Sequence, residues 1–183
     1  MAASDQDTSS QRPPAGTVAC LSQSALDRRL AEEINRAGRH GTPLSCLLVT
    51  IGNLDELLRE HGDGLYEETL TYVARALGSQ VRDFDRIGAP SDGELLLLLP
   101  GADGPRGEVV ARRALQRLRT IKLELDGERR PLSVSVGLAA WRADLSGAEL
   151  LELARGAARS SDAASHGLAS PSPPALGRPD RPA

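Results

Sequence analysis

Apolar residues along this chain recur with a spacing that alternates between that of helices and that of buried strands. From Leu26 to Ala37 they lie three or four residues apart, which predicts a helix that ends near Gly38. The same spacing predicts four further helices, the first two of which end at Gly62 and Gly78. These helices cover, in chain order, Leu54–Leu58, Leu65–Leu77, Val109–Ile121 and Ala148–Ala164.

Shorter runs that are apolar almost throughout predict strands. They are Leu44–Ile51, Phe84–Ala89, Glu94–Leu99 and Leu132–Ala139. The first run is typical of a strand covered on both faces. The second and third are separated by Pro90–Gly93, whose residues favour a tight turn. The order of elements is helix, strand, two helices, hairpin, helix, strand, helix, which predicts a single α/β sandwich.

Composition predicts one folded domain between two tails. The chain has 183 residues, enough for one domain of ordinary size. Residues 1–16 and 168–183 are rich in Ser, Pro, Gly and charged residues, and such segments cannot bury enough apolar area to offset the cost of ordering. We therefore expect a folded domain over 17–167 with a disordered tail on each side.

Charge and hydrophobicity exclude several classes of partner. The formal net charge is −3, whereas non-specific attraction to nucleic acid needs a basic surface. The longest apolar stretch, Leu95–Pro100, is too short to cross a bilayer, and residues 1–16 do not resemble a signal peptide. Cys20 and Cys46 lack metal-ligand spacing and are expected to be buried and reduced. These features predict a cytoplasmic protein that neither binds nucleic acid nor inserts into membranes.

Four blocks, in this order, resemble the GGDEF (diguanylate cyclase) family over residues 17–167. They are Thr50–Glu67, which fits the family's first motif without a gap, Ser91–Leu95 at the signature hairpin, Ser135–Ala139, and Leu150–Ala157 at the start of the last helix motif. The resemblance implies a nucleotidyl-cyclase-like sandwich whose central sheet is five-stranded, mostly antiparallel and flanked by helices.

The same resemblance implies that the metal-binding chemistry of the family has been lost. Diguanylate cyclases join two GTP molecules by phosphoryl transfer, which requires carboxylate ligands for Mg²⁺. The two family carboxylates correspond here to Thr50 and Gly93, and of the signature acids only Glu94 remains. The sequence therefore predicts no catalytic residue, no metal ligand, no cofactor and no enzymatic activity.

Positions that hold the nucleotide in the family are also changed. The signature Gly-Gly pair is Ser91-Asp92, and the guanine-reading Asn and Asp correspond to Leu58 and Glu67. The Lys that the family offers to the triphosphate falls at Asp162, which has the wrong charge. Like the missing carboxylates, these changes predict that the chain has no enzymatic activity.

One family feature is retained, the Arg-x-x-Asp motif that binds the product cyclic di-GMP in many members. Arg82 and Asp85 match it, with five residues between Asp85 and the signature. A guanidinium pairs with phosphate or with the acceptor edge of guanine, and a carboxylate accepts from guanine N–H groups. Gapless counting adds Arg113 from the next helix, and Arg36 matches a position from which some members reach across a dimer.

These residues predict a catalytically inactive receptor for cyclic di-GMP, which signals through an unidentified protein partner and can form a ligand-linked homodimer. A nucleotide-independent interaction module derived from a GGDEF domain is the alternative, with Arg82 and Asp85 then a solvated surface pair. A GTP-binding or weakly active cyclase is the third hypothesis, against which Thr50 and Gly93 weigh.

Overall fold

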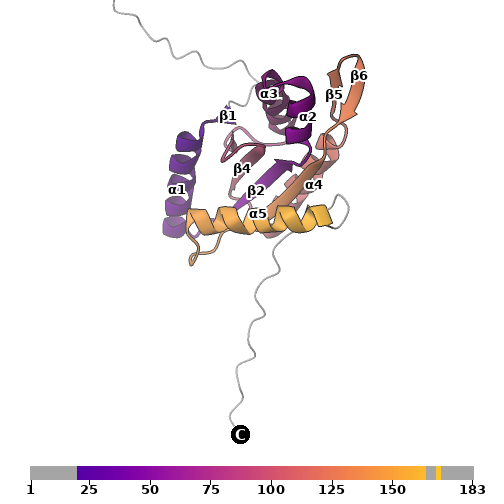
Figure 1. Ribbon diagram of the computed structural model, residues 1–183. Helices are drawn as coiled ribbons and strands as arrows, with labels where there is room; N and C mark the ends of the chain where they lie inside the picture. The colour runs from indigo at the N-terminus through magenta and orange to yellow at the C-terminus, as the bar shows by residue number, and fades with distance from the viewer. Residues whose placement is uncertain (1–19, 164–167, 170–183) are drawn as a thin grey trace, which may run out of the picture.

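A twisted sheet of six strands forms the centre of the molecule in the computed structural model, which describes residues 20–163, 168 and 169 (Figure 1). Its strands, in spatial order, are β1 (Cys20–Leu21), β3 (Arg86–Gly88), β4 (Glu94–Pro100), β2 (Leu44–Ile51), β7 (Val134–Ala140) and β8 (Leu168–Ala169). A separate hairpin is formed by β5 (Lys122–Leu125) and β6 (Glu128–Pro131). The helices are α1 (Gln23–His40), α2 (Leu54–His61), α3 (Gly64–Gly78), α4 (Gly104–Leu118) and α5 (Gly147–Ala163).

The central strand β2 pairs antiparallel with β4 on one side and with β7 on the other. Its residues alternate between the two faces of the sheet, so that Leu47 and Val49 join one buried cluster while Cys46 and Leu48 join the other. Seven of its eight residues are buried, which explains why the sequence shows an apolar run rather than an alternation.

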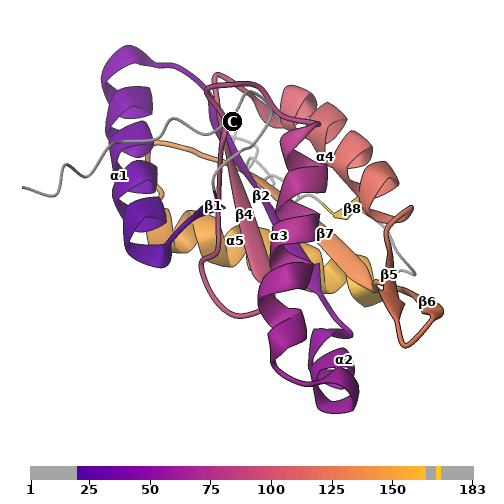
Figure 2. The ribbon, with the colours of Figure 1, turned by 90° about the horizontal axis from the view of Figure 1, so that it is seen from above.

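The helices cover both faces of the sheet. Apolar side chains of α2, α3 and α4 pack in the larger cluster on one face, and those of α1 and α5 pack in the smaller cluster on the other. Figure 2 shows β7 between α4 and α5, in agreement with the α/β sandwich expected from the order of elements.

The expected five-stranded, mostly antiparallel sheet differs in detail from the one observed. Adjacent strands within the series β3, β4, β2 and β7 are antiparallel to one another. The two-residue strands β1 and β8 extend the sheet at its edges by parallel pairing with β3 and β7. Two-residue strands leave no periodic signal, so the pattern of apolar residues could not find them. β8 falls at the start of the segment expected to be a tail, and the remaining tail residues lie outside those that the structure describes.

The bounds of helices α1 and α4 also differ from those expected, and one hairpin was missed. Helix α1 continues through Gly38 to His40, because one glycine inside a helix costs only about 1 kcal/mol and burial of neighbours such as Ala37 offsets it. Helix α4 begins at Gly104, ahead of Val109, because Asp103 and Pro105 form its start. The β5–β6 hairpin was missed, since its strands are short and mostly exposed.

Burial corrects one expectation for the cysteines. Cys46 is buried, and burial raises its thiol pKa to about 12, which makes it unreactive. Cys20, which was expected to be buried, is exposed at the edge strand β1. None of the helices within the described residues is long and apolar enough to cross a membrane.

Candidate functional site

The signature residues form the tight turn between β3 and β4. Gly93 adopts a left-handed φ of 69°, a conformation that favours glycine, and its carbonyl accepts a hydrogen bond from the Ile51 N–H at 3.0 Å. In the β2–β4 pairing, Thr50 lies opposite Glu94. The fold therefore brings together Thr50, Gly93 and Glu94, as the resemblance implied.

Tyr66 of α3 holds this turn from one side. Its hydroxyl is 3.1 Å from a carboxylate oxygen of Asp92 and accepts a long hydrogen bond of 3.4 Å from the Gly93 N–H. Burial is the main cause that raises the Tyr66 pKa, and the hydrogen bond to Asp92 adds to it. A pocket of about 400 Å³ lies beside the turn and is lined by Leu54, Asp55, Leu58, Asp63, Tyr66, Glu67, Asp92 and Gly93. Four carboxylates make this pocket acidic.

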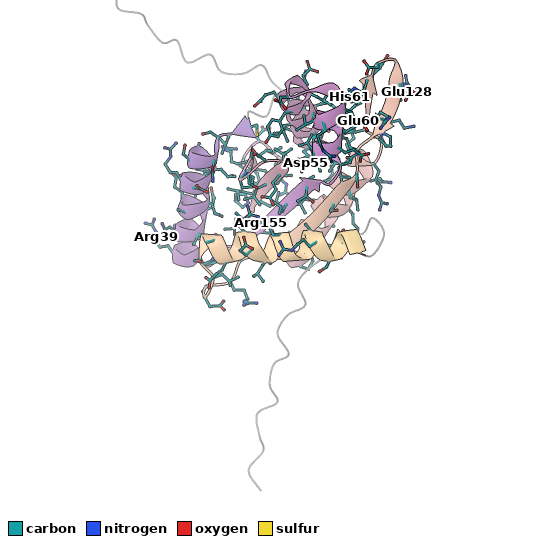
Figure 3. All side chains as sticks on the ribbon, in the orientation of Figure 1. Arg39, Asp55, Glu60, His61, Glu128 and Arg155 are labelled. Carbon is teal, nitrogen blue, oxygen red and sulfur yellow. The ribbon has the colours of Figure 1, made fainter. Side chains whose placement is uncertain are left out.

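Arg155 lies on α5 (Figure 3). Its hydrogen bonds to Glu94 hold the turn from the other side. Its Nη2 lies 2.7 Å from Glu94 Oε2, and its Nη1 lies 2.7 Å from Glu152 Oε1. Burial acts to raise the Glu94 pKa, but hydrogen bonds from Arg155 and Ser91 and the nearby positive charge outweigh burial and lower it. The position that the family fills with lysine, Asp162, lies near the end of α5, and its side chain is outside the described part of the structure.

Arg82, Asp85 and Arg113 meet in a second pocket, of about 260 Å³, between the end of α3 and the exposed face of α4. We call it the Arg82 pocket, and it is lined by Ser79, Gln80, Val81, Arg82, Asp85, Arg106, Val109, Val110 and Arg113. Three guanidinium groups face one carboxylate, so the pocket is suited to an anion. Within the described residues, the side chains of Arg82 and Arg113 make no hydrogen bond or ion pair, and the Arg82 guanidinium contacts the ring of Phe84.

Asp85 is held in place by its own turn. It is 5% exposed, and its Oδ2 accepts a hydrogen bond from the backbone N–H of Arg82 at 2.8 Å. Burial raises the pKa of Asp85, while the hydrogen bond and the charges of Arg82 and Arg86 act against burial. The carboxylate therefore shapes the Arg82 turn in addition to lining the pocket.

Arg82 also borders a neighbouring pocket of about 300 Å³, beside α1. Its guanidinium lies over the half-exposed ring of Phe84, 5.6 Å from the ring centre. Arg36 lines this pocket from α1 and is 58% exposed, with its Nε 3.7 Å from the buried Glu33 carboxylate. Arg36 therefore lies near Arg82 in the same chain, outside the Arg82 pocket itself.

Several residues of these sites were missed from the sequence. Tyr66 and Arg155 lie in blocks that resemble the family but were given no role, and Arg106 lies in none of these blocks. Each of the three residues meets its site only through tertiary contacts. The spacing of Arg106 could have identified it, because it lies seven residues before Arg113 and thus on the same face of a helix.

Comparison with known proteins agrees with the resemblance seen in the sequence. The family model "Diguanylate cyclase, GGDEF domain" matches residues 20–166. Diguanylate cyclase DosC of Escherichia coli K12 is 28% identical over 135 residues, and DosC of Shigella sonnei is 27% identical. Each match covers 73% of this chain and 29% of the relative, so the chain spans less than a third of the length of these proteins.

Solved structures share the fold. Diguanylate cyclase SiaD of Pseudomonas aeruginosa, in complex with its activator SiaC, superposes with a TM-score of 0.77 at 23% identity, over 83% of this chain and 59% of SiaD. The GGDEF domain of DgcB from Caulobacter crescentus, in complex with c-di-GMP, gives 0.74 at 18% identity over 84% and 90%. The FimX GGDEF domain of P. aeruginosa gives 0.75 at 16% over 89% and 99%. The expected GGDEF-like sandwich is confirmed.

The expectation that the chain is not an enzyme is wrong. The matching family model is that of a diguanylate cyclase, and the curated relatives are named diguanylate cyclases. The expectation rested on single side chains at motif positions such as Thr50 and Gly93, whereas the family match rests on the whole pattern of residues 20–166. By its sequence pattern and its fold, this chain belongs to the GGDEF domain family of diguanylate cyclases.

Proposed function

We propose that this GGDEF domain binds cyclic di-GMP in the Arg82 pocket and passes occupancy of the pocket to a protein partner. One observation carries the proposal: residues from two separate elements, the Arg82–Asp85 turn and helix α4 with Arg113, line the same pocket.

The chemistry of the pocket suits the two parts of the ligand. Arg82, Arg106 and Arg113 supply guanidinium groups for the phosphodiesters, which are anionic at neutral pH. Asp85 offers a carboxylate to the guanine N–H groups. Val109, which is 56% exposed, provides an apolar surface beside these charges against which a base can pack. No metal ion is required for these contacts.

The dimensions suggest how the ligand is held. A volume of about 260 Å³ is slightly below the range of roughly 300–1,000 Å³ typical of pockets that enclose a drug-sized ligand. Cyclic di-GMP would therefore project from the Arg82 pocket, and Arg82 and Phe84 border the neighbouring pocket into which it would extend. The DgcB domain, which shares the fold, has been crystallised with c-di-GMP.

A protein partner completes the proposed role. SiaD, another protein with this fold, forms a complex with its activator SiaC. We propose that here, too, a protein reads the state of the domain, with ligand at the α3–α4 surface altering what that protein contacts. A nucleotide-independent interaction module is the rival function, and ligand titration separates the two.

Isothermal titration calorimetry with cyclic di-GMP tests the proposal. The wild-type chain should bind, and Arg82→Ala should weaken binding about thirtyfold, because loss of a charged hydrogen-bond donor costs on the order of 2 kcal/mol. Arg112→Ala is the matched control: Arg112 is a neighbour of Arg113 on α4, pairs with Glu108 at 3.1 Å and does not line the pocket. This variant should bind like wild type.

Two results would contradict the proposal. One is no heat of binding at high micromolar cyclic di-GMP with correctly folded wild-type protein. The other is equal affinity in the wild-type, Arg82→Ala and Arg112→Ala proteins. The first result would favour the nucleotide-independent interaction module. The second would place cyclic di-GMP binding outside the Arg82 pocket.

A further inference from the structure

The signature turn contains an ion pair that links it to the last helix. Three contacts join the Arg155 guanidinium to the Glu94 carboxylate: Nε to Oε1 at 3.0 Å, Nε to Oε2 at 3.2 Å, and Nη2 to Oε2 at 2.7 Å. The Ser91 hydroxyl donates to Oε2 as well. The Glu94 side chain is 14% exposed and that of Arg155 is 24% exposed, so water screens this pair only partly.

This geometry leaves little capacity on Glu94 for another cation. Both oxygens of the carboxylate already accept hydrogen bonds from the guanidinium fork, and one accepts a further bond from Ser91. A divalent ion bound to Glu94 would lie within a few ångströms of the Arg155 charge. Glu152, one turn before Arg155 on α5, fixes the outer side of the guanidinium at 2.7 Å and so holds it in this orientation.

The other groups at the turn do not make up a metal site. GGDEF domains are associated with a divalent cation, for which carboxylate oxygens are the preferred ligands. Thr50, opposite Glu94 in the sheet, carries a hydroxyl, and Gly93 carries no side chain. The other carboxylate of the turn, that of Asp92, accepts a hydrogen bond from the Tyr66 hydroxyl at 3.1 Å. Within the described residues, no group of three or more Asp, Glu, His or Cys side chains is arranged to hold a metal ion. The donor set therefore does not fit the ion.

We propose that the Arg155 guanidinium takes the charge-balancing place of a divalent cation at the signature turn. The positive charge that neutralises Glu94 is then part of the chain, and α5 supplies it. The turn keeps its geometry without metal, with Arg155 on one side and Tyr66 on the other. This role does not involve the Arg82 pocket, so it can be tested independently of cyclic di-GMP binding.

Thermal unfolding with EDTA, Mg²⁺ or Mn²⁺ at constant ionic strength tests the role of Arg155. The wild-type Tm should be the same in all three conditions. Arg155→Ala leaves the partly buried Glu94 charge without a partner and should lower the Tm in EDTA by about 5 °C or more. Millimolar Mn²⁺ should recover part of that loss, because a cation can then reach Glu94. The double variant Arg155→Ala/Glu94→Gln should not respond to Mn²⁺.

Arg159→Ala is the matched control, since Arg159 acts on Glu94 through its charge and, in the described part of the chain, donates no hydrogen bond to that carboxylate. Its Tm should change by less than about 2 °C and should not depend on metal. A wild-type Tm that rises with Mn²⁺, or an Arg155→Ala protein that matches Arg159→Ala, would overturn the proposal. If Arg155→Ala does not fold, the wild-type protein is titrated with Mn²⁺ and the free ion is measured by electron paramagnetic resonance. Tight Mn²⁺ binding that Glu94→Gln abolishes would refute the proposal.

Discussion

Gly137 of β7 is the residue on which the contact between the sheet and α5 most depends. A Cβ atom built at this position would overlap the backbone carbonyl oxygen of Ala154 and the backbone nitrogen of Ala158. Backbone atoms cannot move aside as the end of a long side chain can. The glycine in the Ser135–Ala139 block is therefore explained by close approach of the helix to the strand.

The first prediction concerns this close approach. Gly137→Ala should lower the free energy of unfolding by about 3 kcal/mol or more, because α5 must move away from β7. Gly156→Ala, on α5 itself, should instead raise the free energy of unfolding. Its new Cβ would meet only the end of Arg159 at 4.0 Å, and alanine favours a helix over glycine by up to about 1 kcal/mol. Urea unfolding of both variants checks the pair, and equal destabilisation would contradict it.

The second prediction, also at the residue scale, concerns acid stability. The folded-state pKa of Glu94 is lowered from 4.5, so its ion pair stabilises the fold above that value and the stabilisation is lost as pH falls through the folded pKa. Glu94→Gln should be less stable than wild type near neutral pH, and the difference should shrink towards about pH 3. Urea unfolding across this pH range measures it. A difference that is constant with pH would contradict the assignment.

At the scale of elements, the start of α4 decides where the arginines of the Arg82 pocket lie. Asp103 caps this helix, since its carboxylate accepts a hydrogen bond of 2.9 Å from the Arg106 N–H, and Pro105 lies in the first turn. Arg106 lies in this first turn and Arg113 about two turns later, and both line the pocket.

The third prediction follows from this cap. Asp103→Ala should cost about 1 kcal/mol of stability, because a helix donor loses its partner. Asp63→Ala is the control at the start of α3, where the Asp63 side chain makes no capping hydrogen bond, and its cost should be smaller. Thermal unfolding compares the two variants. A larger loss for Asp63→Ala would show that the cap of α4 has been misjudged.

At the scale of the whole molecule, the proposed ligand offers a route to self-association. Cyclic di-GMP presents two guanines, and Arg36 on the exposed side of α1 is available to a ligand held by a second chain. The weak contact of Arg36 with Glu33, at 3.7 Å, would not prevent such an interaction.

The fourth prediction is therefore ligand-dependent dimerisation, measured by light scattering. Wild-type protein should increase in mass with saturating cyclic di-GMP, and Arg36→Ala should remain monomeric while it still binds the ligand in calorimetry. Arg28→Ala removes another exposed arginine of α1 that lies outside the pocket and should behave as wild type. An Arg36→Ala protein that still dimerises would exclude this contact.

Much of the fold could be predicted because its long elements depend on local patterns. The run Leu44–Ile51 identified β2 with the observed boundaries, and Gly78 marked the end of α3 as expected. The short strands β1 and β8 could not be found, because two residues show no period and their pairing depends on a distant neighbour. The spacing of Arg82 and Asp85 identified one side of the candidate pocket.

The sequence by itself determined which segments are buried, where the long helices and strands lie, and the family to which the chain belongs. Burial and the positions of the long elements follow from side-chain polarity and backbone preference within a few residues. The family follows from the order and spacing of motifs over residues 20–166. Only the tertiary structure joined Arg113 to the Arg82 turn, and Arg155 to Glu94 across 61 positions of sequence. Contacts of this kind depend on how separate elements pack against the sheet, and residues far apart in the chain carry no local signal that they will meet.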